Sequence, residues 1–389
     1  MIFEDEINQT IRYLKPSGIR AFFDMAATRK GVVSLGVGEP DFITPWHIRE
    51  EAIRAIENGK TFYTGNRGLE KLRRGICNYY SRRFNVEYDP LSECIVTVGA
   101  SEGIDIVLRT ILRPGDEVIL PTPAYVAYAA IIEMAGAKVV ELELKEEDRF
   151  KVGPEALKKV LSPKSKAIIM NYPGNPTGGI MTREDYAAIV PILKERSLYV
   201  LSDEIYAELT YGLKHCSIAE FEEIRDHVVV LNGFSKAYSM TGYRVGYVLA
   251  SKEMIDMCMK IHQYTIMCAT TPSQYAAIEA VNNGDQDIEE MAESFRQRRN
   301  YIVKELNRIG LATHSPEGAF YVFPSIRPTG LRSEEFCKRL LEEENLALVP
   351  GSAFGDAGEG HVRISYAYSL EEIKEAIKRL EHFLIQFRK

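Results

Sequence analysis

The sequence predicts an α/β protein with a mainly parallel central sheet in a large domain and a smaller α+β domain. Apolar runs typical of strands alternate with helical patterns from about residue 94 to 250, which favours a parallel sheet covered on both faces. The C-terminal part mixes helices with short strands. With 389 residues the chain is too long for one ordinary core. We therefore expect an N-terminal arm at 1–45 that joins the small domain, a large domain at 46–280 and a small domain at 281–389.

Composition narrows the class of protein. The net charge is −7, the pI is about 5.7 and no basic patch stands out, so nucleic acid is not an expected partner. No apolar run is long enough to span a bilayer, and the acidic N-terminus lacks a signal-peptide core, so we expect a cytoplasmic protein without a membrane partner. Six scattered cysteines and seven histidines form no CxxC or HExxH motif, so reduced thiols and no bound metal are expected.

The first third of the chain carries three candidate features. A short strand at 32–35 leads into closely spaced Gly36 and Gly38, which suggests either a close backbone approach or a plain turn. The apolar spacing from Trp46 to Asn58 predicts a helix. Tyr63 precedes another predicted helix at 69–84 and reads first as a surface aromatic.

Residues 94–120 predict a strand, a tight turn and a helix. The strand covers 95–98, and Gly99, Ala100 and Ser101 open the helix. The free N–H groups and dipole of such a helix start form an anion site. A simple strand-to-helix turn has comparable weight for this segment alone.

Three more strand ends carry polar or aromatic residues. Tyr125 follows a strand at 118–120 and could stack on a planar ligand or belong to the core. Asn175 lies in a loop dense in proline and glycine after a strand at 166–171. Asp203, with Tyr206 close behind, follows an apolar strand at 198–201. An aspartate there is either a functional carboxylate or a helix N-cap, and the cap is ordinarily the commoner case.

Residues 228–246 hold the most informative stretch. Val228 to Leu231 predict a buried strand that Asn232-Gly233 would end as a turn. Lys236 follows at the carboxyl end of that strand, where open α/β sheets place their chemistry. Dehydration there favours the neutral amine, which attacks carbonyls. Ser235 and Arg244 are residue types that bind phosphate. The alternative is a surface lysine in a loop.

The C-terminal part is predicted to contain helices over 252–268 and across 273–309, a strand at 318–326 and a helix at 333–344. A strand at 361–367 carries Arg363 between two apolar residues. Ser369 and Glu372 form a capping box at the start of the last helix.

Together these residues fit one ligand, pyridoxal 5′-phosphate. Its phosphate suits a helix start, a hydroxyl and a guanidinium. Its ring suits an aromatic stack, a carboxylate at the ring nitrogen and donors to the ring hydroxyl, and its aldehyde suits an imine with a lysine. The candidates for the phosphate are Gly99, Ala100, Ser101, Ser235 and Arg244. Tyr125 is the candidate for the aromatic stack, Asp203 for the ring nitrogen, and Asn175 and Tyr206 for the ring hydroxyl. Lys236 is the candidate for the imine.

The segments SLGVGEPDF, TVGASEGID, PGNPTGG, SDEIY, NGFSKAYSMTGYRVGY and HVRIS resemble, in this order and over essentially the whole chain, those of class I aminotransferases. These are pyridoxal-phosphate enzymes of fold type I. The chain is most similar to the bacterial and archaeal subgroup of aspartate, aromatic and N-acetyl-diaminopimelate aminotransferases.

This resemblance implies an aminotransferase that works by a ping-pong cycle, with 2-oxoglutarate as the expected acceptor. Lys236 would form the internal aldimine and move the proton, and Arg363 would bind the substrate α-carboxylate with help from Asn175 and the backbone at Gly38. Aromatic, aspartate and diaminopimelate-type donors all stay open.

The resemblance also implies a homodimer with shared sites, because Tyr63 would reach the cofactor phosphate of the neighbouring subunit. Ile19 and Phe22, in a short predicted helix of the N-terminal segment, are expected to contact substrate.

Two positions depart from the pattern. Aspartate-specific relatives carry a lysine where this chain has Ser101, and some relatives carry a serine where it has Gly233. The first weakens a strict aspartate preference, and the second removes one phosphate hydroxyl.

Two other functions are compatible with parts of this pattern. A cysteine-S-conjugate β-lyase would use the same fold and lysine and release pyruvate and ammonia without an acceptor. A non-catalytic regulator with this fold would need a DNA-binding segment ahead of the arm, and the sequence leaves no room for one.

Overall fold

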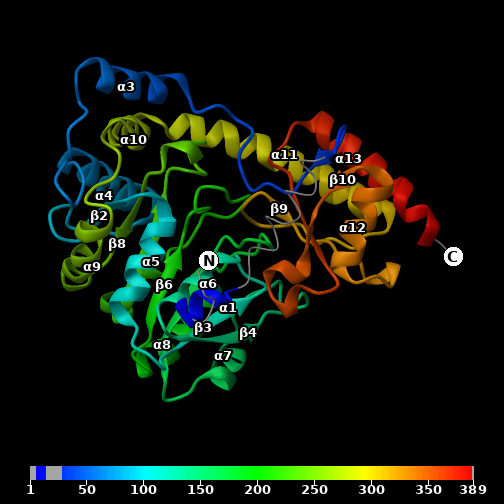
Figure 1. Cartoon of the computed structure of the whole chain (residues 1–389), viewed down its shortest axis with the longest axis horizontal. Coiled ribbons are helices and arrows are strands. Elements are labelled where there is room, and N and C mark those ends of the chain that lie inside the picture. Colours follow the sequence, from blue (N-terminus) through cyan, green and yellow to red (C-terminus); the bar gives the residue numbers. More distant parts are fainter. Residues whose placement is uncertain (1–5, 15–28, 388–389) are drawn as a thin grey trace.

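The computed structural model describes residues 6–14 and 29–387 and consists of a large α/β part joined to a smaller C-terminal part (Figure 1). Seven strands form the large sheet in the spatial order β2-β8-β7-β6-β5-β3-β4. In that order their bounds are Cys94–Thr97, Gly246–Leu249, Val228–Gly233, Tyr199–Asp203, Ser165–Asn171, Glu117–Thr122 and Lys138–Glu143. The predicted α/β class is confirmed.

The sheet is mostly parallel, as predicted, with one exception. β8 runs antiparallel to both β7 and β2, whereas the other neighbouring pairs are parallel. Asn232 pairs with Tyr247 and Gly233 with Gly246, so both residues belong to β7. The predicted turn at Asn232-Gly233 is therefore wrong. A Cβ on Gly233 would lie 3.0 Å from the Cα of Gly246, so this glycine allows a close approach of strands rather than a turn.

Both faces of the sheet are covered, which explains why the first four residues of β7, Val228 to Leu231, are all apolar. Val229 and Leu231 pack in one core with α5, α6 and α9, and Val228 and Val230 pack in the other with α4, α8 and α10. The bounds are α5 Gly99–Ile111, α6 Ala127–Met134, α9 Lys252–Thr265, α4 Glu70–Phe84, α8 Arg183–Glu195 and α10 Thr271–Asn283. α3 (Trp46–Glu57) and α7 (Pro154–Val160) add Ile48 and Leu157 to the core that contains α4.

The C-terminal part has a third core. α11 (Asp285–Ile309), α12 (Ser333–Glu344) and α13 (Leu370–Leu384) pack there against short strands. β9 (Tyr321–Val322), β11 (Val349–Pro350) and β12 (Val362–Ser365) form an antiparallel sheet, and β1 (Val33–Ser34) pairs with β10 (Leu346–Ala347). The long α11 connects the parts, because Ile288 packs in the core of the sheet and Phe295 in the C-terminal core (Figure 1).

Several predicted elements are confirmed in this region. α12 covers the predicted range 333–344, and both hydrogen bonds of the capping box between Ser369 and Glu372 are present. The strand predicted at 318–326 is reduced to β9, since Ala319 has a φ of 56° and an extended backbone cannot continue through it. A short helix, α1 (Gln9–Tyr13), begins the described chain.

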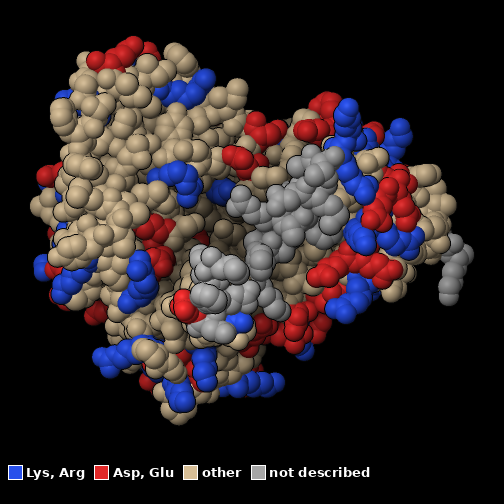
Figure 2. All heavy atoms as spheres, viewed as in Figure 1, with Lys and Arg blue, Asp and Glu red and all other residues tan. Residues whose placement is uncertain are grey.

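Within the described ranges, no helix is both long and apolar enough to cross a membrane. No group of three or more histidine, cysteine or acidic side chains there is arranged to hold a metal ion. On the face shown in Figure 2, acidic and basic side chains are interspersed rather than gathered in one broad surface.

Candidate active site

A cavity of about 400 Å³ opens at the carboxyl ends of β5, β6 and β7. Asn171 and Asp203, the last residues of β5 and β6, line it, together with Lys236 in the loop after β7. Gly38 and Arg363 line it from the C-terminal part. The topology thus brings together groups that lie far apart in the sequence, as expected for an open α/β sheet.

Lys236 projects into this cavity and is largely desolvated. Burial lowers the pKa of Lys236 to about 8, and the positive charges of Arg363 and Arg244 act in the same direction. Its Nζ donates a hydrogen bond of 2.6 Å to the carbonyl of Gly38. At Gly38 a side chain is excluded, because a Cβ would lie within 2.1 Å of the Tyr321 hydroxyl. A neutral amine is therefore accessible near physiological pH at this position.

Asp203 is a buried carboxylate, with 4% of the residue exposed. The Tyr128 hydroxyl donates to it at 2.6 Å and the Ile205 N–H at 3.2 Å. Burial raises the pKa of Asp203 to about 6 in spite of these hydrogen bonds. The helix-cap interpretation is wrong, because turns and no helix follow β6. The carboxylate instead faces the cavity, where it can pair with a cation or a protonated ring nitrogen.

The predicted anion site lies at the start of α5. Ala100, Ser101, Ser235 and Arg244 all line the cavity. Gly99 does not line it but has a φ of 75°, and a Cβ there would lie 2.5 Å from the Arg244 Nη2, so the guanidinium rests directly against this glycine. A helix start, two hydroxyls and a guanidinium therefore converge at one end of the cavity. This donor set suits a phosphate.

Arg363 forms the opposite end of the site. It is buried, its Nη1 donates to the Asn175 Oδ1 at 2.9 Å and its Nη2 to the Gly36 carbonyl at 2.5 Å. Its Nε has no hydrogen-bond partner among the described residues. The guanidinium also lies over the Tyr321 ring at 4.6 Å. A fixed, incompletely paired guanidinium facing a cavity is suited to bind a carboxylate.

Tyr125 and Tyr206 both line the cavity. Tyr125 packs edge-on against Tyr128, with ring centroids 5.4 Å apart. The hydroxyls of Tyr206 and Tyr321 lie 2.8 Å apart.

The remaining predicted site residues are Tyr63, Ile19 and Phe22. Tyr63 is 81% exposed and does not line the cavity. Ile19 and Phe22 lie outside the described residues.

Sequence reasoning missed part of the lining. Asn171 accepts from the N–H of Asn175 at 3.0 Å and so orients that loop. Tyr128 holds Asp203, and Tyr321 stacks on Arg363. Tyr128 and Tyr321 belong to apolar runs, where a tyrosine cannot be told from a core aromatic. The position of Asn171 at a strand end beside two predicted site loops was a usable signal.

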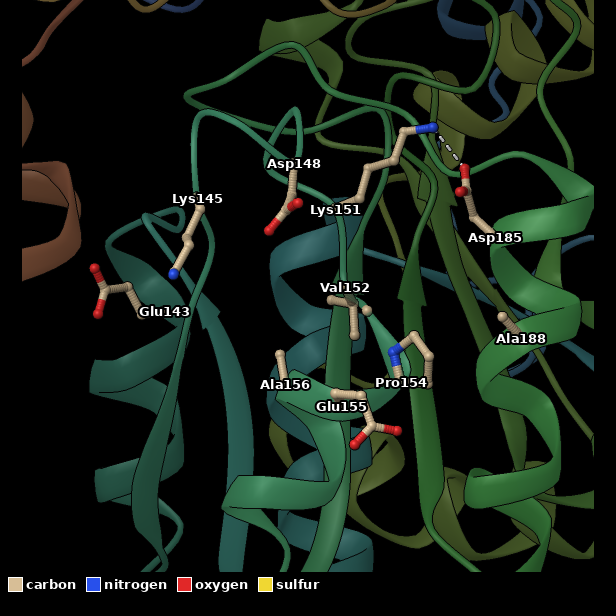
Figure 3. Close-up of a pocket in the computed structure, with 11 residues that line it drawn as sticks. Glu143, Lys145, Asp148, Lys151, Val152, Pro154, Glu155, Ala156, Asp185 and Ala188 are labelled. Atoms are coloured by element: carbon tan, nitrogen blue, oxygen red, sulfur yellow. Dashed lines mark hydrogen bonds and ion pairs between the residues drawn. The ribbon is translucent and has the colours of Figure 1, made fainter.

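Another cavity, of about 380 Å³, lies beside β4, α7 and α8 (Figure 3). Carboxylates and two lysines line it, and Lys151 is already paired with Asp185 at 2.6 Å. Its described lining lacks the buried charged side chains that meet around Lys236.

Comparison with known proteins agrees with this geometry. Residues 30–380 match the family described as aminotransferase class I and II. The chain belongs to this family. Aminotransferases of this class depend on pyridoxal 5′-phosphate.

Individual aminotransferases are similar over nearly their whole length. An aspartate aminotransferase of Pyrococcus abyssi is 44% identical, with 95% of this chain and 96% of that protein covered. A protein of Bacillus subtilis named probable N-acetyl-LL-diaminopimelate aminotransferase is 43% identical, with 99% and 97% covered. The crystal structure of an aromatic aminotransferase from Pyrococcus horikoshii superimposes with a TM-score of 0.90 at 42% identity, covering 94% of this chain and 99% of that one.

The residues present fit the cofactor of this aminotransferase family. At Gly99 a Cβ would fill the space that the Arg244 guanidinium occupies beside the helix start, and Asp203 keeps a carboxylate in a buried position at the cost of a raised pKa. The first feature suits the phosphate of the cofactor, and the second suits its basic ring nitrogen.

Proposed function

We propose that this aminotransferase moves the amino group of an L-amino acid to a 2-oxo acid, 2-oxoglutarate being the expected acceptor, in a ping-pong cycle centred on Lys236. The observation that carries the proposal is the position of Lys236. Its desolvated amine lies in one cavity with the Asp203 carboxylate and the Arg363 guanidinium.

We assign the cofactor contacts as follows. The N–H groups at Gly99, Ala100 and Ser101 would bind the phosphate together with Ser235 and Arg244. Tyr125 would pack against the ring, Asp203 would pair with the ring nitrogen, and Asn175 and Tyr206 would lie near the ring hydroxyl. When bound, pyridoxal phosphate supplies a conjugated ring that accepts the electron pair from the substrate Cα.

The protein's own groups orient the substrate and move the proton. Arg363 binds the α-carboxylate as a fork whose position is fixed by Asn175 and Gly36. The Lys236 Nζ would take the proton from the substrate Cα and deliver it to the C4′ carbon of the cofactor, and the second half of the cycle would reverse this transfer. The pKa of Lys236 of about 8 suits a group that must both accept and release a proton near neutral pH.

The described lining favours a neutral aromatic donor. Its only cations are Lys236, Arg244 and Arg363, and each already has an assigned partner. Ser101 stands where aspartate-specific enzymes of this type carry a lysine. Tyrosines and isoleucines make up much of the remaining wall, and one similar structure is an aromatic aminotransferase. Aspartate and diaminopimelate-type donors follow in our ranking.

We further propose a homodimer in which Tyr63 completes the partner's site. Phe62 and Tyr63 are each 81% exposed and Tyr264 is 86% exposed, which is unusual for large aromatic side chains. Ile53 and Ile56 of α3 are also exposed. A second copy of the chain is the occupant that would bury these side chains and bring Tyr63 to a phosphate.

Two coarser assignments accompany this proposal. We place the domain boundaries at 45/46 and 280/281, close to where α11 passes from one core to the other. We propose a cytoplasmic location, supported by six free cysteines and no disulfide in the described chain.

Visible absorption of the purified holoenzyme tests the proposed function. Single amino acids are added without an acceptor. We expect the band of the lysine-bound cofactor to convert to the pyridoxamine band, fastest with aromatic donors. Release of pyruvate and ammonia with the band unchanged would instead indicate a β-lyase. A protein that shows no band after addition of pyridoxal phosphate would contradict the assignment of Lys236.

A further inference from the structure

A buried acid–base pair lies directly behind the proposed phosphate site. The His262 Nδ1 of α9 is 2.5 Å from the Glu102 Oε1 of α5, and the histidine side chain is fully buried. The second oxygen of Glu102 accepts from the N–H of Val98 at 2.5 Å. α5 and α9 pack side by side (Figure 1). Glu102 immediately follows Ser101, so its charge lies within the first turn of the helix that would bind the phosphate.

The hydrogen bonds of His262 indicate which of its nitrogen atoms carry protons. Its Nε2 lies 2.9 Å from the carbonyl of Asn66, and a carbonyl only accepts, so Nε2 carries a proton. Its Nδ1 faces a carboxyl group, so a second proton is shared between the two side chains. The pair therefore carries one proton more than a free carboxylate and a neutral imidazole. Its net charge is zero, and Glu102 presents no uncompensated negative charge to a phosphate.

The same histidine contacts the loop that carries Tyr63. Besides the bond from His262 to Asn66, the Thr271 Oγ1 donates to the Phe62 carbonyl at 2.6 Å and the Gln274 Nε2 donates to the Thr64 Oγ1 at 3.1 Å. Tyr63 has an exposed side chain, yet a hydrogen bond holds the backbone of the residue before it and another holds the side chain of the residue after it. His262 thus lies between the phosphate-binding turn of its own subunit and the loop that would serve the partner.

We propose that His262 is a positioning residue for the cofactor phosphate, and that it acts by neutralising Glu102 while it holds the Tyr63 loop against α5. This inference rests on the proposed function, since it requires a phosphate at the start of α5. Without His262, the carboxylate of Glu102 would keep an uncompensated negative charge in the first turn of the helix that would bind the phosphate dianion, and like charges disfavour each other where water is excluded.

The test compares the affinity of the apoenzyme for pyridoxal phosphate and for pyridoxal, which lacks the phosphate. His262→Gln keeps an amide donor for Asn66 but leaves Glu102 uncompensated. We expect its dissociation constant for pyridoxal phosphate to rise by about tenfold or more, in keeping with the loss of one partner of a buried pair, and that for pyridoxal to stay unchanged. The double variant Glu102→Gln/His262→Gln has no unpaired charge and should regain most of the lost affinity.

His382→Gln is the matched control, because His382 is an exposed histidine paired with Glu344 at 2.7 Å on α13. It should bind both ligands as the wild type does. Equal losses for pyridoxal phosphate and pyridoxal in His262→Gln, or a double variant as weak as the single one, would overturn the proposal.

Two further comparisons separate a failure of the role of His262 from a failure to fold and from a failure of the proposed function. If His262→Gln does not fold, Glu102→Gln alone is measured. It removes a negative charge from the phosphate-binding turn and should bind pyridoxal phosphate at least as tightly as the wild type, whereas weaker binding contradicts the inference. If the wild type itself shows no preference for pyridoxal phosphate over pyridoxal, the proposed function is at fault and not the role of His262 alone.

Discussion

Replacing Asp203 by asparagine should stabilise the apoenzyme while it abolishes efficient turnover. A rise in pKa from 3.8 to about 6 corresponds to about 3 kcal/mol of penalty for keeping this carboxylate ionised in the folded protein at neutral pH. Asparagine has nearly the same shape and carries no charge. It weakens the contact with Tyr128 from a charge-assisted to a neutral hydrogen bond, which costs about 1 kcal/mol. The net gain in unfolding free energy should be about 2 kcal/mol at pH 7.5.

The sign of this effect depends on pH. Because the folded-state pKa of Asp203 is raised, the penalty is absent when the carboxyl is protonated in both states. It develops as pH rises through 3.8 and is complete above about 6. The advantage of Asp203→Asn should therefore disappear near pH 4.5.

Urea denaturation of the apoenzymes at the two pH values measures this difference. Asp148→Asn, a change at an exposed carboxylate beside the cavity of Figure 3, is the control and should alter stability by less than about 0.5 kcal/mol. An Asp203→Asn apoenzyme that is less stable than the wild type at pH 7.5, or whose advantage does not depend on pH, would refute the reasoning.

Three more outcomes are expected. Lys236→Ala should lose the visible band and nearly all turnover, measured by spectroscopy and steady-state kinetics, and retained turnover would remove Lys236 from the mechanism. Arg363→Lys should raise KM about tenfold or more, since one ammonium cannot replace the fork that binds a carboxylate, and an unchanged KM would contradict that role. For His47, partial burial lowers the pKa, but its hydrogen bonds to Asp287 and Glu279 raise it overall. The contacts of protonated His47 with these two carboxylates stabilise the fold below pH 6.5, and this stabilisation is lost as pH rises through the higher folded-state pKa. His47→Gln should therefore flatten that part of a plot of melting temperature against pH. A plot that the substitution leaves unchanged argues against these contacts.

The sequence predicted the parallel sheet well because its signals are local and strong. Val228 to Leu231 are apolar on both faces, and only a strand buried on two sides has that composition. The capping box at Ser369 was equally easy to predict, since its hydrogen bonds join residues that are three positions apart in the sequence. β8 could not be oriented from sequence, because an apolar run does not reveal the direction in which its neighbours run.

Most of the charged residues that line the cavity were named from the sequence, whereas the residues that support them were missed. Lys236 and Asp203 lie at strand ends, where the topology itself points to function. Tyr128 and Tyr321 act through hydroxyls that contact residues 75 and 115 positions away, and such distances leave no periodic trace in the chain. The prediction of a turn at Asn232-Gly233 was wrong for a related reason. The local preference of this dipeptide for a turn was outweighed by its pairing with β8, which comes later in the chain.

The restrained guanidinium of Arg363 bears on how the substrate preference of such a protein can change during evolution. Two of its donor positions are held by Asn175 and by the backbone of Gly36, and an aromatic ring supports its face. In the proposed function it would bind the carboxylate that all α-amino acids share and make no contact with the side chain that varies. Substitutions of other residues that line the cavity could then change which substrate side chain is preferred without changing how the carboxylate is bound or how the proton is moved. Esters, amides and decarboxylated amines are poor ligands on this basis, whatever side chain they carry.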